Sequence, residues 1–203
     1  MNKNNLSNNL NIPLILGSSS PFRKELLARL GMDFTTESPE INESRQSNES
    51  AEDLVRRLSI EKAKAIAANR ENALIIGSDQ VAIIDGEILG KPGTTEKAES
   101  QLQKASGKTV TFLTGLCLLN TRSGNYQVDI VPYSVFFRDL TTEQIKSYVE
   151  KERPLNCAGS FKSEGLGVAL FAKMEGEDPT ALIGLPLIRL VSMLKEEGIE
   201  ILA

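Results

Sequence analysis

The sequence predicts an α/β fold, because apolar strand-like runs alternate along the chain with segments of helical periodicity. The chain has 203 residues, of which 40% are hydrophobic and 25% charged, a balance that suits one globular domain. Residues 1–11 hold six asparagines and two leucines, which provide neither the apolar core of a signal peptide nor a membrane span. We therefore expect a disordered tail over 1–11, a single domain over 12–203 and a cytoplasmic location.

The first apolar run leads through a serine-rich turn into a helix. Ser20 is a suitable N-cap, Pro21 fits the first helical position and Gly31 is a good stop. Arg23 is unusual in the first turn, where free N–H groups favour carboxylates. An anionic ligand reverses that argument, because backbone N–H groups, serine hydroxyls such as those of Ser18 and Ser20, and the guanidinium would converge on phosphate oxygens. The alternative is a surface helix with solvated cations.

A strong helix is expected over 51–69, after an acidic loop over 37–49. Its buried stripe passes through Leu54, Leu58 and Ile66, with Val55 and Ala65 beside it, and it also contains Lys62. Leaving an ammonium unpaired in a core is costly, so Lys62 pairs with carboxylates or projects into a wet cleft. The alternative is a lysine that snorkels to the edge of the stripe.

The next strand, over 74–80, brings Asp79 and Gln80 to its end. Ligands gather at the ends of strands in α/β proteins, although an aspartate there can also cap a turn. Lys91 lies in a loop that Pro92 stiffens, which could aim the ammonium at a ligand. Its alternative is a solvated loop lysine.

The remaining elements continue the alternation of strands and helices. The sequence predicts a tight hairpin at Asp85-Gly86, helices over 96–105, 141–152 and 186–198, and long strands over 109–119 and 126–137. The loop over 160–165 is a further candidate site, since Gly165 and Gly167 permit close backbone approach to a ligand. Neither GxxxxGK[ST] nor GxGxxG occurs, so a P-loop or a Rossmann dinucleotide site is unsupported.

Composition excludes several classes of chemistry. The chain contains no histidine, which rules out Ser-His-Asp triads, Cys-His pairs and histidine metal sites. Its net charge is −4 and it has no lysine-arginine block, so we expect no nucleic-acid polymer as a partner. Cys117 and Cys157 form no CxxC motif and are expected to be reduced thiols. Acid–base work therefore falls to Asp, Glu, Lys or Tyr.

Eight motifs, in order from about residue 12 to the C-terminus, resemble those of the Maf family of nucleoside triphosphate pyrophosphatases. They are the strand-SSSPFRKELL turn, Glu40-Ile41-Asn42-Glu43, Glu61-Lys62-Ala63, Gly77-Ser78-Asp79-Gln80, Gly90-Lys91-Pro92, Ser106-Gly107, Ala158-Gly159-Ser160 and Gly184-Leu185-Pro186-Leu187. The resemblance implies an elongated α/β fold, related to the inosine triphosphate pyrophosphatases, with a mixed sheet flanked by helices and two lobes around a cleft. It also allows a homodimer.

The resemblance further implies an enzyme that cleaves between the α and β phosphates, with Mg²⁺ or Mn²⁺ as cofactor. Asp79 matches the family's proton acceptor, and Arg23, Glu43, Lys62 and Lys91 match its other active-site positions. Three cations would then hold the triphosphate, while Glu43 and Asp79 share the metal ion.

Substrate choice in this family follows three positions, which Phe22, Gln80 and Glu164 fill here. The last two resemble the branch that acts on 7-methyl-GTP, whose methylated base is cationic. Phe22 could stack on that base and Glu164 could accept from its N–H groups. Phe22 replaces the tryptophan typical of that branch. The alternatives are the dTTP and UTP branch, a nucleotide-binding regulator of cell division and septum formation, and a sugar-phosphate phosphatase.

Overall fold

The computed structural model describes residues 12–202, so the predicted tail over 1–11 lies outside the described residues. Within them, seven strands form one sheet in the order β2-β1-β3-β5-β6-β7, with β4 paired to β3. The strands are β1 (Leu14–Gly17), β2 (Thr35–Glu37), β3 (Leu74–Ile84), β4 (Glu87–Leu89), β5 (Thr109–Asn120), β6 (Tyr126–Phe137) and β7 (Phe171–Gly176). β1 runs parallel to β2 and β3, whereas the other pairs are antiparallel. The predicted α/β fold with a mixed sheet is confirmed.

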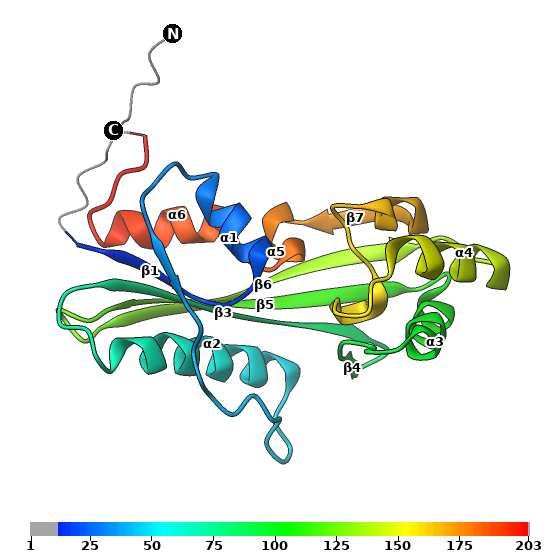
Figure 1. Ribbon diagram of the computed structural model, residues 1–203, viewed down its shortest axis with the longest axis horizontal. Coiled ribbons are helices and arrows are strands. Elements are labelled where there is room, and N and C mark those ends of the chain that lie inside the picture. Colours follow the sequence, from blue (N-terminus) through cyan, green and yellow to red (C-terminus); the bar gives the residue numbers. More distant parts are fainter. Residues whose placement is uncertain (1–11, 203) are drawn as a thin grey trace, which may run out of the picture.

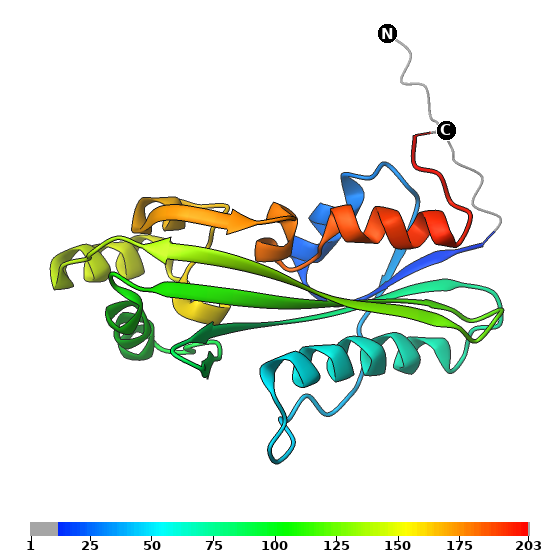
Figure 2. The ribbon, with the colours of Figure 1, turned by 180° about the vertical axis from the view of Figure 1, so that it is seen from behind.

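Helices cover both faces of this sheet. They are α1 (Pro21–Ala28), α2 (Ala51–Ala67), α3 (Thr95–Ala105), α4 (Thr142–Glu152), α5 (Pro179–Ile183) and α6 (Leu187–Glu196), with 3₁₀ turns η1 (Ala158–Ser160) and η2 (Leu166–Leu170). Figure 1 shows α2 on one face and α1, α5 and α6 on the other, and Figure 2 shows the same layers from behind. α3 and α4 stand at the far end of the long strands, so the molecule is elongated (Figure 1).

Each end of the sheet has a hydrophobic core of its own. At the end that carries β1, buried leucines of α1 and α6 pack on one face and α2 packs on the other. At the far end, α3 and α4 surround a cluster of phenylalanines whose ring centroids lie 4.8 to 5.6 Å apart, formed by Phe112, Phe137, Phe161 and Phe171. The two cores correspond to the two predicted lobes, which the strands β3, β5 and β6 join.

β3 is longer than the sequence predicts. It pairs with β5 without interruption from Leu74 to Ile83, so Asp79 lies in the middle of an 11-residue strand and the expected strand end is wrong. Pairing of β1 with β3, however, ends at Gly77. Asp79 therefore lies just beyond the last residue of β1, where one edge of β3 becomes open to the space between the lobes.

α2 shows why a helix forms after the acidic loop. The Ser50 hydroxyl caps its first turn by accepting from the Asp53 N–H at 3.0 Å. Leu54, Leu58 and Ile66 are buried as the period predicts, whereas Ala65 is only partly buried. Lys62 lies in this stripe, with only 6% of its surface exposed.

Several other predicted boundaries agree with the structure to within one or two residues. The hairpin between β3 and β4 turns at Asp85 and Gly86, with φ angles of 49° and 81°. Both cysteines are free thiols, as predicted. Over residues 12–202, no helix combines the length and the apolar character that a membrane crossing requires.

Candidate active site

A cavity of about 850 Å³ opens between the two lobes, and every predicted site residue lines it. Those residues are Ser18, Ser20, Phe22, Arg23, Glu43, Lys62, Asp79, Gln80, Lys91 and Glu164. They come from the β1–α1 turn, the acidic loop, α2, β3 and two loops of the far lobe, so residues far apart in the sequence converge on one space. The volume lies in the range typical of small-molecule sites.

The β1–α1 turn forms one wall of the cavity. Ser20 is the N-cap and accepts from the Arg23 N–H at 3.4 Å, while buried Ser18 accepts from the Ser20 N–H at 3.1 Å and from Arg23 Nη1 at 3.4 Å. Arg23 Nε donates to the Gly184 carbonyl at 2.7 Å. Burial lowers the pKa of Arg23, and the charges of Asp79 and Glu43 oppose that effect. The hydrogen bonds to Ser18 and Gly184 hold the guanidinium close to both carboxylates.

Lys62 joins the two carboxylates of the site. Its Nζ lies 2.7 Å from Asp79 Oδ1 and 2.8 Å from Glu43 Oε1. The prediction that Lys62 pairs with carboxylates is confirmed, and the alternative of a snorkelling lysine is wrong. The hydrogen bond from Lys62 lowers the pKa of Glu43, and the charges of Lys91 and Arg23 lower it further.

Two glycines allow α2 to lie close enough to the sheet for this contact. A Cβ on Gly77 would lie 2.1 Å from the Ser59 carbonyl oxygen, and one on Gly115 would lie 2.4 Å from the Val55 carbonyl oxygen. Gly115 stands opposite Asp79 in the β3–β5 register. The space it leaves holds the buried Ser59 hydroxyl, which accepts from the Asp79 N–H at 3.1 Å. The close approach of α2 thus fixes both Lys62 and the backbone of Asp79.

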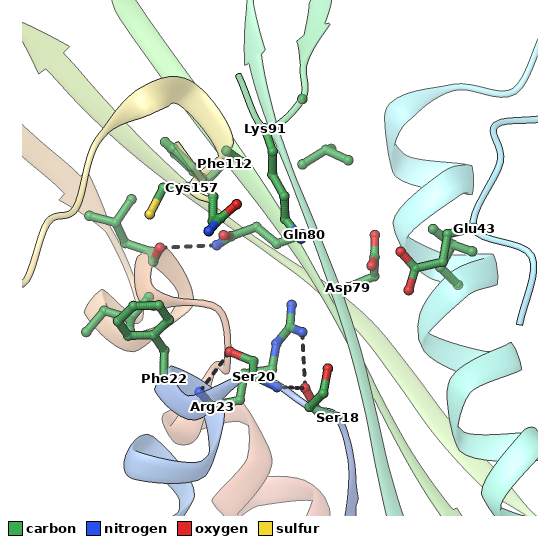
Figure 3. A pocket seen from close by; sticks show the side chains of 18 of the residues that line it. Ser18, Ser20, Phe22, Arg23, Glu43, Asp79, Gln80, Lys91, Phe112 and Cys157 are labelled. Atoms are coloured by element: carbon green, nitrogen blue, oxygen red, sulfur yellow. Dashed lines mark hydrogen bonds between the residues drawn. The ribbon is translucent and has the colours of Figure 1, made fainter. Parts of the chain in front are cut away.

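The far lobe supplies Lys91 through the loop after β4. Figure 3 shows Lys91 reaching into the cavity from the wall opposite Arg23. Gln101 of α3 donates from Nε2 to the Gly90 carbonyl at 3.2 Å and accepts from the Ser160 hydroxyl. The loop that carries Lys91 is therefore tied to the loop that leads to Glu164.

Glu164 lies in an exposed position on the loop between η1 and η2. Glu152 holds this loop, because its carboxylate pairs with Lys162 Nζ at 3.1 Å and accepts from the Leu166 N–H at 2.9 Å. Added Cβ atoms on Gly165 and Gly167 would meet Glu152 and the Lys162 backbone. These glycines therefore serve packing within the loop, and close approach of a ligand to them stays a prediction.

The cavity has two chemically different sides. Figure 3 shows Phe22 on one side and Glu43 on the other, with Arg23, Gln80 and Asp79 between them. Phe22 exposes 37% of its surface although it is a large apolar residue. An aromatic face thus lies at the side away from the carboxylates, where a flat ring of a ligand could stack.

Gln80 is fixed by α5 and β5. Its Nε2 lies 2.7 Å from the Ala181 carbonyl oxygen, 3.2 Å from that of Leu182 and 2.9 Å from Thr114 Oγ1. With the side-chain nitrogen held by the protein, the side-chain oxygen of Gln80 is the atom available to a ligand.

Glu43 and Asp79 provide hard oxygen donors of the kind that Mg²⁺ and Mn²⁺ bind. Over residues 12–202, no group of three or more carboxylate or thiol side chains has the geometry of a metal centre. Mg²⁺ is commonly bound through one or two carboxylates together with water and substrate phosphates. The pair therefore fits a metal ion that arrives with a polyphosphate.

Sequence reasoning missed Ser59, Gly115 and Gln101, which hold the predicted residues in place. Ser59 left one signal, since it is a polar residue next to the apolar stripe of α2 and comes three positions before Lys62. Gly115 and Gln101 could be recognised only with the strand register and the tertiary contacts in hand.

Comparison with known proteins finds a matching family and similar sequences over nearly the whole chain. The sequence model of the Maf-like protein family matches residues 13–197. A Pseudomonas aeruginosa protein named 7-methyl-GTP pyrophosphatase is 63% identical over 188 residues, which cover 93% of this chain and 98% of that protein. Proteins of the same name from Pseudomonas savastanoi pv. phaseolicola and Colwellia psychrerythraea are 57% and 53% identical, over 93% and 94% of this chain and 98% and 95% of their own lengths.

Proposed function

Because this chain belongs to the Maf-like protein family, we propose that it hydrolyses nucleoside triphosphates to a monophosphate and pyrophosphate, with a preference for 7-methyl-GTP. The observation that carries the proposal is the convergence of Arg23, Lys62 and Lys91 on the carboxylates Glu43 and Asp79 in one cavity. Such a set suits a polyanion that must be both bound and cleaved. The names of the relatives support the choice of nucleotide.

Membership of the family implies cleavage between the α and β phosphates, and the carboxylates provide a proton acceptor for that reaction. Water attacks the α-phosphorus, a new P–O bond forms, and the bond to the bridging oxygen of the β-phosphate breaks so that its electrons leave on pyrophosphate. Asp79 takes the proton of the attacking water. Among the described residues, its Oδ1 is paired with Lys62 and no hydrogen bond or ion pair occupies Oδ2, which is the oxygen that can accept that proton.

The remaining residues bind and orient the triphosphate. Arg23, Lys62 and Lys91 balance the negative charge of the phosphates, and the hydroxyls of Ser18 and Ser20 donate to their oxygens. Glu43 and Asp79 would hold Mg²⁺ or Mn²⁺, and a bound divalent ion would neutralise charge on the phosphates. Positioning and charge balance then account for most of the rate enhancement.

Recognition of the base belongs to the opposite side of the cavity. The methylated guanine is cationic, so the face of Phe22 attracts it and the Glu164 carboxylate pairs with its N–H edge. The side-chain amide oxygen of Gln80 accepts from another N–H of the base. We further propose that residues 12–203 form one catalytic domain of a cytoplasmic homodimer that has no nucleic-acid polymer as partner.

The test is turnover of 7-methyl-GTP, GTP, dTTP, UTP and CTP with Mg²⁺ or Mn²⁺, with pyrophosphate and orthophosphate measured separately. We expect pyrophosphate, mainly from 7-methyl-GTP. Pyrophosphate mainly from dTTP or UTP would overturn the proposed base preference but keep the reaction. Release of orthophosphate alone would indicate a phosphatase, and nucleotide binding without any turnover would indicate a regulatory protein.

A further inference from the structure

The acidic loop that carries Glu43 is fixed to α2 by one arginine outside the cavity. Arg57 donates to both carboxylate oxygens of Glu49, at 2.6 and 3.0 Å, and to Glu61 Oε2 at 3.0 Å. Its Nη2 also donates to the Ser44 carbonyl at 3.1 Å. The Arg57 guanidinium thus links Ser44 and Glu49, which lie at the two ends of the turn in the loop, to α2, the helix that bears Lys62.

Glu49 completes this connection from the loop side. Only 7% of its side chain is exposed, and its carboxylate also accepts from the Gln46 N–H at 3.0 Å. Arg45 reaches back from the turn to donate to the Glu49 carbonyl at 2.8 Å. A buried carboxylate with a bidentate arginine is a strong and geometrically specific contact. The Arg57–Glu49 pair is therefore a built structural feature, unlike the exposed ion pairs elsewhere on the molecule.

Glu43 itself depends on the loop for its position. Its side chain is 59% exposed, and within residues 12–202 it forms an ion pair with Lys62 alone. With one ion pair to hold so exposed a side chain, the position of its backbone also determines where the carboxylate lies. The nearest contact that holds this backbone to α2 is the one between Ser44, its neighbour in sequence, and Arg57.

We propose that Arg57 and Glu49 are positioning residues that hold Glu43 against Lys62 and so set the affinity of the site for a divalent metal ion with a nucleotide. Neither residue lines the cavity, so they act through Glu43 and touch no substrate. The inference rests on the proposed function only in the identity of the ligand, because the contacts that hold the loop do not depend on turnover. Loss of partners of a metal-binding carboxylate typically weakens metal binding about 10- to 100-fold.

The experiment compares Arg57→Gln, Arg57→Lys and Glu49→Gln with the unchanged protein. Arg56→Gln is the matched control, since Arg56 is the exposed neighbour on the same helix. Mn²⁺ binding is measured by titration in the presence of a 7-methyl-GTP analogue with a non-hydrolysable α–β methylene bridge. Cleavage by trypsin after Arg45 is followed by mass spectrometry, because that bond lies within the loop. Thermal denaturation identifies any variant that fails to fold.

We expect Arg57→Gln and Glu49→Gln to weaken Mn²⁺ binding about tenfold or more and to speed cleavage after Arg45. A variant that combines Arg57→Gln with Glu49→Gln should bind Mn²⁺ no more weakly than either single variant, since the two residues act as one unit. The Mn²⁺ affinity and the cleavage rate of Arg57→Lys should lie between those of these variants and those of the unchanged protein, because lysine keeps the charge but not the bidentate contact. Arg56→Gln should change neither measurement.

The proposal is overturned if Mn²⁺ binding stays within twofold in folded Arg57→Gln and Glu49→Gln variants, or if Arg56→Gln weakens it equally. It is also overturned if the unchanged protein binds no Mn²⁺ with the analogue. Should the unchanged protein bind both ligands but release no pyrophosphate from any nucleotide, the proposed function fails while the binding ratios still decide the role of Arg57 and Glu49.

Discussion

At the scale of single residues, the site is organised by a lysine buried between two carboxylates. Lys62 is 6% exposed and Asp79 is 9% exposed, so both charges depend on each other and on Glu43 for compensation. An arrangement that only stabilised the fold would not need to face a cavity. Here the pair borders the open edge of β3, next to Arg23.

Asp79→Asn tests the proposed role of Asp79 as proton acceptor. Asparagine has nearly the same volume but cannot take a proton from water, so we expect turnover to fall about 10²- to 10⁴-fold. Lys62 keeps Glu43 as a partner, so the variant should fold. The measurement is kcat with saturating nucleotide and metal, and circular dichroism serves as the control. A rate close to that of the unchanged protein would show that another group accepts the proton.

The sequence predicted these residues because each breaks a local pattern. Lys62 interrupts an apolar stripe, and Arg23 lies in a first turn that favours carboxylates. Ser59 and Gln101 break no such pattern strongly, since polar residues are common on helices. Their roles depend on contacts with Asp79 and Gly90, which are distant in the sequence.

At the scale of secondary-structure elements, the decisive feature is the close packing of α2 on β3 and β5. α2 lies so close to the sheet that there is no room for a side chain at Gly77 or Gly115. The helix therefore lies near enough to the sheet for Ser59 to bond the Asp79 backbone and for Lys62 to reach its carboxylate. The packing of α2 on the sheet thus determines the positions of Ser59 and Lys62 relative to Asp79.

Gly115→Ala should disturb stability and activity together. The added Cβ would lie 2.4 Å from Ser59 Oγ and from the Val55 carbonyl oxygen, so α2 must shift away from the sheet. Overpacking of this kind costs about 1–3 kcal/mol of the free energy of unfolding. We expect a lower melting temperature and a reduced kcat, because Ser59 and Lys62 move relative to Asp79.

Gly90→Ala is the control for the melting temperature. A Cβ at Gly90 would meet no heavy atom within 4 Å, so that variant should melt like the unchanged protein. Equal melting temperatures and equal rates for Gly115→Ala and the unchanged protein would mean that α2 does not set the geometry of Asp79.

Most elements with a clear period were predicted, but the two after η2 were not. β7 exposes every residue after Phe171, so it lacks the alternation of a half-buried strand. α5 has only five residues and acts through backbone carbonyls, which accept from Gln80 Nε2 and from Arg23 Nε at its C-cap, Gly184. Main-chain acceptors are present at every position of a sequence and carry no signal there.

At the scale of the whole molecule, the long strands of one sheet join two lobes, and the cavity lies between these lobes. The lobe that carries β1 supplies Arg23, Lys62 and Asp79, whereas the far lobe supplies Lys91 and Glu164. The length of β3 could not be predicted, because the polar Ser78-Asp79-Gln80 segment resembles a strand end unless β5 is known to continue beside it. That continuity is what brings residues of the two lobes to a common cavity.

The proposed separation of Glu164 from the phosphate-binding residues predicts that base preference can be changed without changing phosphate binding. Glu164→Gln keeps the shape of the side chain but removes the charge that would attract a cationic base. Hydrogen bonds to charged groups exceed those to neutral groups by about 1 kcal/mol, so we expect the preference for 7-methyl-GTP over GTP, as a ratio of kcat/KM values, to fall roughly fivefold. Inhibition by inorganic tripolyphosphate should stay unchanged, since the phosphate end of the cavity is untouched.

Glu150→Gln is the matched control for this change, because Glu150 is exposed on α4 and does not line the cavity. It should alter neither the ratio nor the inhibition. A Glu164→Gln variant with an unchanged ratio would remove Glu164 from base recognition and leave Phe22 and Gln80 to provide it. A Glu164→Gln variant in which tripolyphosphate inhibition changes as much as the ratio would contradict the separation of base recognition from phosphate binding, because Glu164 would then act at the phosphate end of the cavity.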